Sequence, residues 1–325
     1  MRIWLSLLLC LCCFSALADE YVLEKQVIVA QQTQDFLDIS TFNHDQFAGK
    51  YQNIGDFLQQ QVGVQIRSSG VGNPVTISIR GSTHQQVKFV IDGHEVNDAQ
   101  YGGFDLNKIP LHQIEQIQVI QGNSSSNAYG NAVGGTILIQ TLSAGQYSKD
   151  SIFGSTATFD TTTYGFTKYF KANGFGLFSF EELYSKADYD YTVNTPDDTP
   201  NDFSRIEHLN NNQFYKSNAL LKWQSDATKK QLVGIKGLYL KSKNNLPYYQ
   251  LNPDLFDASI SSDEWEIQSY LESNINLNWH SKTEISINDK HELFLDDEKY
   301  PISINSDQTS YDTRIYRFKQ SIDYK

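Results

Sequence analysis

Three histidines and three aspartates occur close together in one stretch of the chain. They are His84, His94 and His112, and Asp92, Asp98 and Asp105. Imidazole and carboxylate groups together can bind a metal ion or exchange protons in acid–base catalysis. Their spacing matches no zinc or hydrolase signature, however, and no serine or cysteine nucleophile motif accompanies them. We therefore interpret the histidines as solvated loop residues and do not predict an enzyme.

A second group of possible ligands lies in residues 186–213, which the sequence predicts to be a long loop. Its carboxylates are Asp188, Asp190, Asp197, Asp198, Asp202 and Glu207. Calcium takes about six to eight oxygen ligands, and Asn194, Asn201 and backbone carbonyls could complete such a set. The composition equally fits a solvated, flexible acidic loop. Both interpretations stay open, with the five aspartates as the candidate calcium ligands.

The overall charge and the N-terminal segment exclude several classes of protein. A net charge of -12 argues against nucleic acid as a partner, because phosphate binding needs clustered cations. Residues 1–18 have a basic start at Arg2, an apolar run and a small-residue cleavage site at Ala16–Leu17–Ala18. They predict a cleaved secretory signal peptide, with a lipoprotein signal as the alternative. Because all three cysteines lie there, the mature chain would have no disulfide and no cysteine ligand.

Residues 33–142 carry the elements of one mixed α+β domain. Apolar residues at helical spacing predict a short helix at 54–60. Alternation and turn residues predict strands starting at 63 and covering 76–81 and 87–93. Residues 109–141 predict two further strands on either side of a glycine-rich turn at 122–131. The paired glycines Gly134 and Gly135 before the second strand permit a close backbone approach.

The stretch 109–141, IPLHQIEQIQVIQGNSSSNAYGNAVGGTILIQT, resembles the end of the plug domain of TonB-dependent outer-membrane receptors. The resemblance implies that residues 33–142 are the plug. Where most plugs carry charged residues and a proline, this chain has Gln116, Gln118, Gln121 and Asn123. We expect these glutamines to hydrogen-bond across the plug–barrel interface. For the retained Arg80 and Glu115, a structural ion network with the barrel wall is favoured over a direct role in transport.

The resemblance also assigns a role to the segment before the plug, residues 19–32. It contains Glu24, Lys25, Gln26, Val27, Ile28, Val29 and Ala30. By composition this could be an edge strand or a tail. In TonB-dependent receptors, a segment of this form after the signal peptide is the TonB box, which pairs as an added strand with the energy-coupling protein.

From residue 143 to 325, short segments alternate apolar and polar residues, as the strands of a membrane barrel do. They cover residues 151–160, 163–171, 175–185, 214–224, 231–242, 266–280, 283–293 and 313–325. The connections at 171–174, 225–230 and 281–282 are short, whereas those at 186–213, 243–265 and 294–312 are long. Short turns on one side and long loops on the other are typical of outer-membrane barrels, whose outer surface contacts the lipid bilayer.

About eight predicted strands are too few for a barrel that encloses a plug, since plugged barrels have about 22 strands. We therefore expect an incomplete barrel, the N-terminal portion of a receptor. The implied function is high-affinity binding and energy-coupled transport of a scarce nutrient across the outer membrane. A non-functional truncated fragment of such a receptor is the alternative.

Within the family, two plug loops most resemble the vitamin B12 (cobalamin) receptor branch, in which these loops contact the corrinoid. The corresponding residues are Ser68, Ser69, Gly70, Val71, Gly72, Asn73, Asn97, Asp98, Ala99, Gln100, Tyr101 and Phe104. Tyr101 and Phe104 are expected to give apolar contact. Ferric siderophore receptors share the architecture and remain the alternative. The cobalamin branch orders its substrate loops with calcium, which supports the calcium interpretation of the acidic loop.

Overall fold

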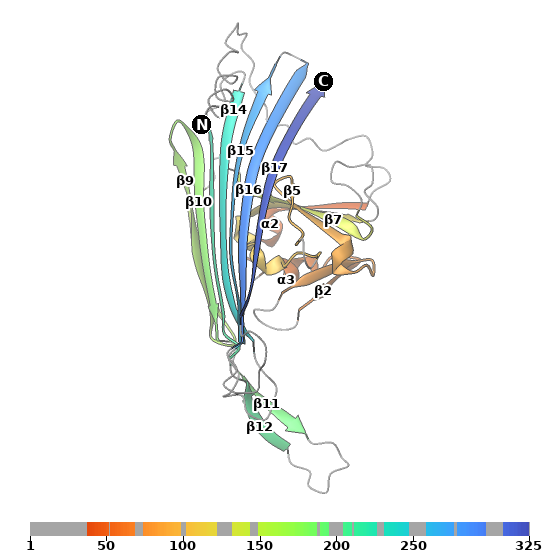
Figure 1. The fold of residues 1–325 in the computed structure, drawn as a ribbon, viewed down its shortest axis with the longest axis vertical. Coiled ribbons are helices and arrows are strands. Elements are labelled where there is room, and N and C mark those ends of the chain that lie inside the picture. The colour runs from red at the N-terminus through yellow and green to blue at the C-terminus, as the bar shows by residue number, and fades with distance from the viewer. Residues whose placement is uncertain are drawn as a thin grey trace.

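The computed structural model consists of a plug and a curved wall of long strands, with the plug on the concave side of the wall (Figure 1). It describes residues 38–51, 53–68, 74–98, 102–121, 132–143, 149–186, 189–194, 204–209, 211–225, 231–246, 258–275, 278–296 and 308–324. Among these residues, no helix is long and apolar enough to cross a bilayer.

The main sheet of the plug has five strands in the order β1-β6-β7-β4-β5. They are β1 (Asp38–Asn43), β4 (Val87–Ile91), β5 (His94–Glu95), β6 (Ile114–Gln121) and β7 (Gly135–Thr141). β4 and β7 pair in parallel, and the other neighbours pair antiparallel. The two strands predicted within residues 109–141 are thus confirmed as β6 and β7. The edge strand β1 was not predicted.

Short helices and a second hairpin complete the plug. The hairpin joins β2 (Val64–Arg67) to β3 (Thr76–Ile79). The helices are α2 (His44–Phe47), α3 (Ile54–Leu58) and the 3₁₀ helices η2 (His84–Gln86), η3 (Leu106–Lys108) and η4 (Leu111–Gln113). Asn53 caps α3 by accepting a hydrogen bond from the Asp56 backbone N–H at 2.9 Å. The helix predicted at 54–60 is therefore present.

A single apolar core holds these plug elements together. Phe47 and Phe57 from the helices pack against the sheet residues Phe89, Ile117 and Ile137, all of them buried. Burial of such large side chains is the main stabilising contribution to a domain of this size. At the start of β7, Gly135 has φ +149°, and a Cβ there would lie 2.6 Å from the Ile120 carbonyl oxygen. This close approach explains the glycine pair in the motif.

The wall is an eight-stranded antiparallel sheet in the order β17-β16-β15-β14-β13-β10-β9-β8. Its strands are β8 (Ser151–Ala157), β9 (Thr161–Lys171), β10 (Gly174–Ser185), β13 (Phe214–Ser225), β14 (Gln231–Leu246), β15 (Ala258–Asn274), β16 (Trp279–Asp296) and β17 (Gln308–Tyr324). The predicted fold class, a mixed plug followed by antiparallel strands of an incomplete barrel, is confirmed.

Several details of the wall differ from the sequence prediction, and the short connection predicted at 281–282 lies inside β16. The predicted strand at 266–280 runs across a turn, because β15 ends at Asn274 and β16 begins at Trp279. Apolar and polar residues continue to alternate through this turn, so the sequence pattern does not reveal where β15 ends. Residues 186–213 are not one open loop, since β11 (Tyr189–Asn194) and β12 (Ser204–Leu209) pair there as a hairpin. It stands away from the wall (Figure 1).

The two faces of the wall have opposite polarity. Outward side chains are apolar and exposed, as for Ile267 (54%), Ile285 (51%), Tyr316 (68%) and Phe318 (71%). Their inward neighbours are polar and buried, as for Glu266, Gln268 and Ser286. Because strand residues alternate between faces, this pattern follows directly from the sequence. An exposed apolar face of this extent is suited to contact with lipid.

Candidate functional site: the plug loops and the plug–wall interface

The two predicted ligand loops are the first loop at 68–73 and the second loop at 97–104. The residues that follow them are bonded to each other in the plug core. Asp105, which follows the second loop, accepts hydrogen bonds from the backbone N–H of Val75 (2.9 Å) and of Asn107 (3.0 Å). The Leu106 N–H donates to the Val75 carbonyl oxygen at 2.9 Å. Burial raises the pKa of Asp105, while these bonds and two nearby lysines partly offset that rise. The residues that follow the two predicted loops, Val75 and Asp105, are therefore held side by side in the plug.

Asn97 and Asp98 shape the second loop. The Asn97 side chain accepts a hydrogen bond from the Phe89 N–H and donates to the carbonyl oxygens of Val87 and Gly102. The Asp98 backbone closes a turn with Gly102 and Gly103, and its carboxylate pairs with Lys290 of β16 at 2.6 Å. Ser68, at the edge of the first loop, is exposed. The structure thus gives Asn97 a loop-forming role and ties Asp98 to the wall.

Phe104 lies in the plug core, not on its surface. Its side chain is 7% exposed, and its ring centroid lies 5.0 Å from that of Phe89. A ring packed in this way has little surface left for a ligand, so the expectation of direct apolar contact at this residue is not supported. The sequence pattern could not separate a loop aromatic from a core aromatic here, because Phe104 lies between the polar loop and η3, only two residues before the core residue Leu106.

Several predicted site residues lie outside the described residues. They are Ser69, Gly70, Val71, Gly72, Asn73, Ala99, Gln100, Tyr101, the TonB box 24–30, and Asp188, Asp197, Asp198 and Asp202 of the acidic segment. The backbone of Asp190 lies in β11 opposite His208. Within the described ranges, no cluster of three or more His, Cys, Asp or Glu side chains is arranged to bind a metal. These assignments stay predictions.

The contacts between plug and wall show which end of the wall the loops face. Near the ends of β13 and β16 that lead into long connections, Lys216 donates to the Asn107 carbonyl oxygen and Lys290 binds Asp98. Near the opposite end of β13, next to a short turn, Lys222 donates to the Thr141 carbonyl oxygen at 3.2 Å. Asp98, at the start of the second predicted loop, and Asn107, just after it, therefore lie toward the long connections.

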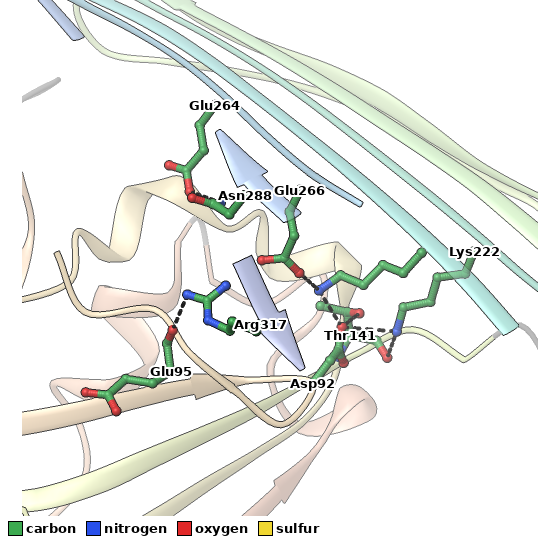
Figure 2. Close-up of polar contacts among 9 residues, drawn as sticks. Asp92, Glu95, Thr141, Lys222, Glu264, Glu266, Asn288 and Arg317 are labelled. Carbon is green, nitrogen blue, oxygen red and sulfur yellow. Dashed lines mark hydrogen bonds and ion pairs between the residues drawn. The ribbon is translucent and has the colours of Figure 1, made fainter. Parts of the chain in front are cut away.

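Asp92, in the turn between β4 and β5, is the centre of the interface (Figure 2). Its carboxylate lies 3.3 Å from the ammonium of Lys222 and 3.1 Å from that of Lys236, and Lys236 also pairs with Glu266 at 3.2 Å. On the plug side, Asp92 accepts hydrogen bonds from the Thr141 N–H (2.9 Å) and hydroxyl (2.7 Å). One carboxylate thus links two plug strands to two wall strands.

Backbone conformation and charge both keep Asp92 in this position. Asp92 has φ +48° and Gly93 has φ +87°, a left-handed turn that aspartate and glycine tolerate better than other residues do. Burial alone would raise the pKa of Asp92. The charges of Lys222 and Lys236 and the two bonds from Thr141 outweigh burial and hold this pKa well below its usual range. The carboxylate is therefore ionised at neutral pH.

Further polar contacts extend the interface along the wall. Arg317 of β17 donates to the Glu95 carbonyl oxygen at 3.0 Å, as Figure 2 shows. Lys108 of the plug pairs with Glu264 of β15 at 3.3 Å, and Asn288 donates to the same carboxylate at 2.9 Å. The sequence predicted a structural ion network between plug and wall that involves Arg80 and Glu115. The centre of the observed network is instead Asp92, which pairs with Lys222 and Lys236 of the wall. Lysines at inward positions of the alternating strands were the signal that could have located it.

The glutamines that replace charged plug residues do not cross the interface. Gln116 donates to Asn43 (3.0 Å), Gln118 donates to Gln116 (3.2 Å), and Gln121 donates to the Val62 carbonyl oxygen (2.8 Å). All these partners belong to the plug, so the expectation of cross-interface bonds is wrong for the bonds that the structure shows. The partners lie on β1, on β6 itself and in the residues before β2.

His94 and His112 are not solvated loop residues, contrary to the sequence interpretation, whereas His84 is partly exposed in η2. His94 is buried, and burial lowers the pKa of its ring despite the nearby carboxylates of Glu266 and Glu284. His112 contacts the wall: one ring nitrogen lies 3.0 Å from Glu181 and the other 3.2 Å from the Ser179 hydroxyl. The spacing of the histidines and aspartates in the sequence argued against a metal site, but it does not indicate whether the histidine side chains are buried.

The Ser179–His112–Glu181 order resembles that of a hydrolase triad, but the site around Ser179 is closed. The Ser179 side chain is 0% exposed, and its hydroxyl also accepts a hydrogen bond from Thr167 at 2.9 Å. The His112 ring packs on Phe153 with a centroid distance of 4.4 Å. A nucleophile needs access to substrate and donors for the developing oxyanion. We interpret these contacts as attachment of the plug to β8 and β10.

A plug sheet fixed inside a curved antiparallel wall is the arrangement found in TonB-dependent receptors. Residues 21–136 match the family model described as the TonB-dependent Receptor Plug Domain. The structure is similar to that of the siderophore receptor PirA from Acinetobacter baumannii, with a TM-score of 0.61 and 17% identity over 86% of this chain and 44% of that chain. The resemblance to TonB-dependent receptors is thereby confirmed.

Among curated proteins, the chain is similar to vitamin B12 transporters. It is 35% identical over 95 residues to Vitamin B12 transporter BtuB of Vibrio vulnificus strain YJ016, covering 29% of this chain and 16% of that protein. It is 26% identical over 220 residues to BtuB of strain CMCP6, covering 65% of this chain and 33% of that protein. The chain thus spans at most about a third of the length of these relatives.

Proposed function

We propose that this chain forms the plug and the adjoining wall of a TonB-dependent transporter in the outer membrane. The observation that carries the proposal is the orientation of the plug. Asp92 and Thr141 contact the wall near the short turns, whereas Asp98, at the start of the second predicted loop, contacts it nearer the long connections. A ligand arriving from outside would meet this loop first. The outward apolar face of the wall supports a position in lipid.

For the substrate, we propose cobalamin, because the curated relatives are named vitamin B12 transporters. A ferric siderophore is the second candidate, supported by the fold shared with the siderophore receptor PirA. Isothermal titration of the detergent-purified protein with cyanocobalamin and with a ferric siderophore separates the two. Binding of cyanocobalamin alone supports the first candidate, and binding of neither overturns both.

The TonB box gives the first prediction. We expect Val27→Pro to abolish energy-dependent uptake while ligand binding at the cell surface persists. Proline removes a backbone donor and fixes φ, which prevents the segment from pairing as an added strand. Uptake of labelled ligand by cells is the measurement, and Gln31→Pro, just after the segment, is the matched control. Normal uptake by the Val27→Pro cells would refute the assignment.

Calcium binding by the acidic segment gives the second prediction. We propose that Asp188, Asp190, Asp197, Asp198 and Asp202 bind calcium, since hard oxygen ligands are what this ion prefers. We expect millimolar calcium to slow protease cleavage within residues 186–213 and to tighten ligand binding. The comparison is with chelator and with magnesium, which demands a stricter octahedral geometry. If chelator changes neither cleavage nor affinity, the segment is only a solvated acidic lid.

A further inference from the structure

Lys290 of β16 lies between two carboxylates that belong to different parts of the fold. Its ammonium is 2.6 Å from the carboxylate of Asp98, in the second predicted loop of the plug. It is also 2.7 Å from the carboxylate of Glu292, on its own strand. The Lys290 side chain is only 9% exposed, whereas those of Asp98 and Glu292 are 21% and 23% exposed. One nearly buried cation is thus shared between the plug and the wall.

Glu292 is a permanent neighbour of Lys290. Residues 290 and 292 are two apart in one strand, so their side chains project from the same face of the wall. Glu292 therefore stays beside Lys290 wherever the plug loop lies. Removing the partner of a buried charge is costly when the charge is left uncompensated. Here the departure of Asp98 would leave Lys290 still paired, which lowers that cost.

Negative charge exceeds positive charge around this contact. Glu264 lies directly opposite Lys290 in the pairing of β15 with β16, and it also binds Lys108 of the plug at 3.3 Å. Three carboxylates, those of Asp98, Glu264 and Glu292, therefore surround two ammonium groups. Like charges repel more strongly at a partly buried interface than in water. One carboxylate of the three is thus held less firmly than a simple ion pair would be.

Asp98 is the carboxylate that can leave. The two glutamates are fixed on wall strands, whereas Asp98 lies in a loop of the plug. After its departure each of the two lysines keeps one glutamate, and the charges are equal. The next charged groups along the interface, Asp105 and Lys216, add one charge of each sign and leave this balance unchanged. The charges of the wall therefore favour release of the loop.

Movement of Asp98 would carry the turn of the second loop with it. The Asp98 N–H donates to the Gly103 carbonyl oxygen at 2.7 Å, and the Gly102 N–H donates to the Asp98 carbonyl oxygen at 2.9 Å. The preceding residue, Asn97, is bonded to the backbone of β4 in the plug core. The turn can therefore swing at Asp98 while Asn97 keeps the base of the loop in place.

We propose that Lys290 is a positioning residue for the second loop, and that its bond to Asp98 is a latch that opens when ligand binds there. The inference rests on the proposed function and adds a means of regulating that site. With the latch closed, the turn is held against β16. With the latch open, Lys290 stays with Glu292, and Asp92 keeps the plug attached to the wall.

The latch is tested first without ligand, by hydrogen–deuterium exchange of the detergent-purified protein. We expect Asp98→Asn to speed exchange in the peptide covering residues 97–104 by about fivefold, because an ammonium binds a neutral amide less strongly than a carboxylate. Glu292→Gln should slow the same exchange by about threefold, because it removes the carboxylate that competes with Asp98 for Lys290. A purely structural role of Glu292 in β16 would not make the plug loop more protected.

Glu272→Gln is the matched control, since Glu272 shares Lys282 with Glu284 in the same way, in a part of the wall next to a short turn. It should leave exchange in residues 97–104 unchanged. If Glu292→Gln gives the same result as Glu272→Gln, the latch is overturned and the transport function stands.

The second measurement is the rate at which cyanocobalamin associates with the purified protein. Because ligand must open the latch, Glu292→Gln should slow association by about threefold, whereas Glu272→Gln should not change it. An unchanged rate together with slower exchange would overturn opening by ligand. Absence of cyanocobalamin binding to the wild type would overturn the proposed substrate, and the exchange results would still decide whether the latch exists.

Discussion

Replacing Asp92 by alanine is expected to destabilise the attachment of the plug by about 3 kcal/mol or more, the usual effect of removing one partner from a buried ion pair. The Lys236 side chain is only 4% exposed, and the loss of Asp92 leaves it with Glu266 as its remaining carboxylate partner. The bonds that hold Thr141 are lost at the same time. The measurement is the denaturant dependence of plug release, followed by protease sensitivity of the plug in the detergent-solubilised protein.

Two comparison variants test whether the loss of stability is specific to Asp92. Asp45→Ala removes an exposed carboxylate from α2 and should change stability by no more than about 0.5 kcal/mol. Combining Asp92→Ala with Lys222→Met also removes the lysine that loses Asp92, while Lys236 keeps Glu266, and should restore part of the lost stability. If Asp92→Ala behaves like Asp45→Ala, Asp92 is not the centre of the interface.

The second large effect is expected in the plug core. Phe89→Ala should lower the free energy of plug unfolding by about 3–5 kcal/mol, the range for removing a buried aromatic ring. Phe89 is fully buried in β4, and its ring packs on Phe104. Because Asn97 bonds to the Phe89 backbone, the second ligand loop should also lose order, and ligand affinity should fall with stability.

Urea unfolding monitored by circular dichroism measures this change, with Val62→Ala as the control. Val62 is 89% exposed, so its truncation should leave stability nearly unchanged. A small loss in Phe89→Ala, with ligand affinity falling alone, would mean that the Phe89–Phe104 pair serves the ligand and not the core.

Elements that depend on local pattern could be predicted from the sequence. The long alternation of strands such as β16 and β17 encodes both their existence and their two faces, as the exposures of Ile285 and Phe318 show. The short polar strand β1 has no such signal, since its sequence DISTFN becomes a strand only by pairing with β6. The hairpin β11–β12 was missed for another reason, since Tyr189, Tyr191 and Val193 do alternate with polar residues but lie in a segment whose many carboxylates indicated a loop.

Inward lysines mark the wall side of the interface in the sequence, but the partners that they find in the plug could not be predicted, because this pairing depends on register between distant parts of the chain. Asp92 belonged to the initial group of His and Asp residues, but nothing nearby in sequence indicates Lys222 or Lys236 as its partners. Those lysines become neighbours only when residues 222 and 236 pair across β13 and β14. A group of residues that suggested acid–base chemistry thus turned out to supply contacts between the plug and the wall.

The order of strands in the wall has a consequence for how the chain folds. Apart from the β10–β13 pair, each wall strand pairs with the strand next to it in sequence, so every hairpin closes a short segment of chain. The plug, in contrast, needs β1 to find β6 and β4 to find β7 across much longer separations. Loop closure costs more entropy as separation grows, and long-range pairing slows folding. We therefore expect amide protons of the wall hairpins to gain protection from exchange before those of the plug sheet.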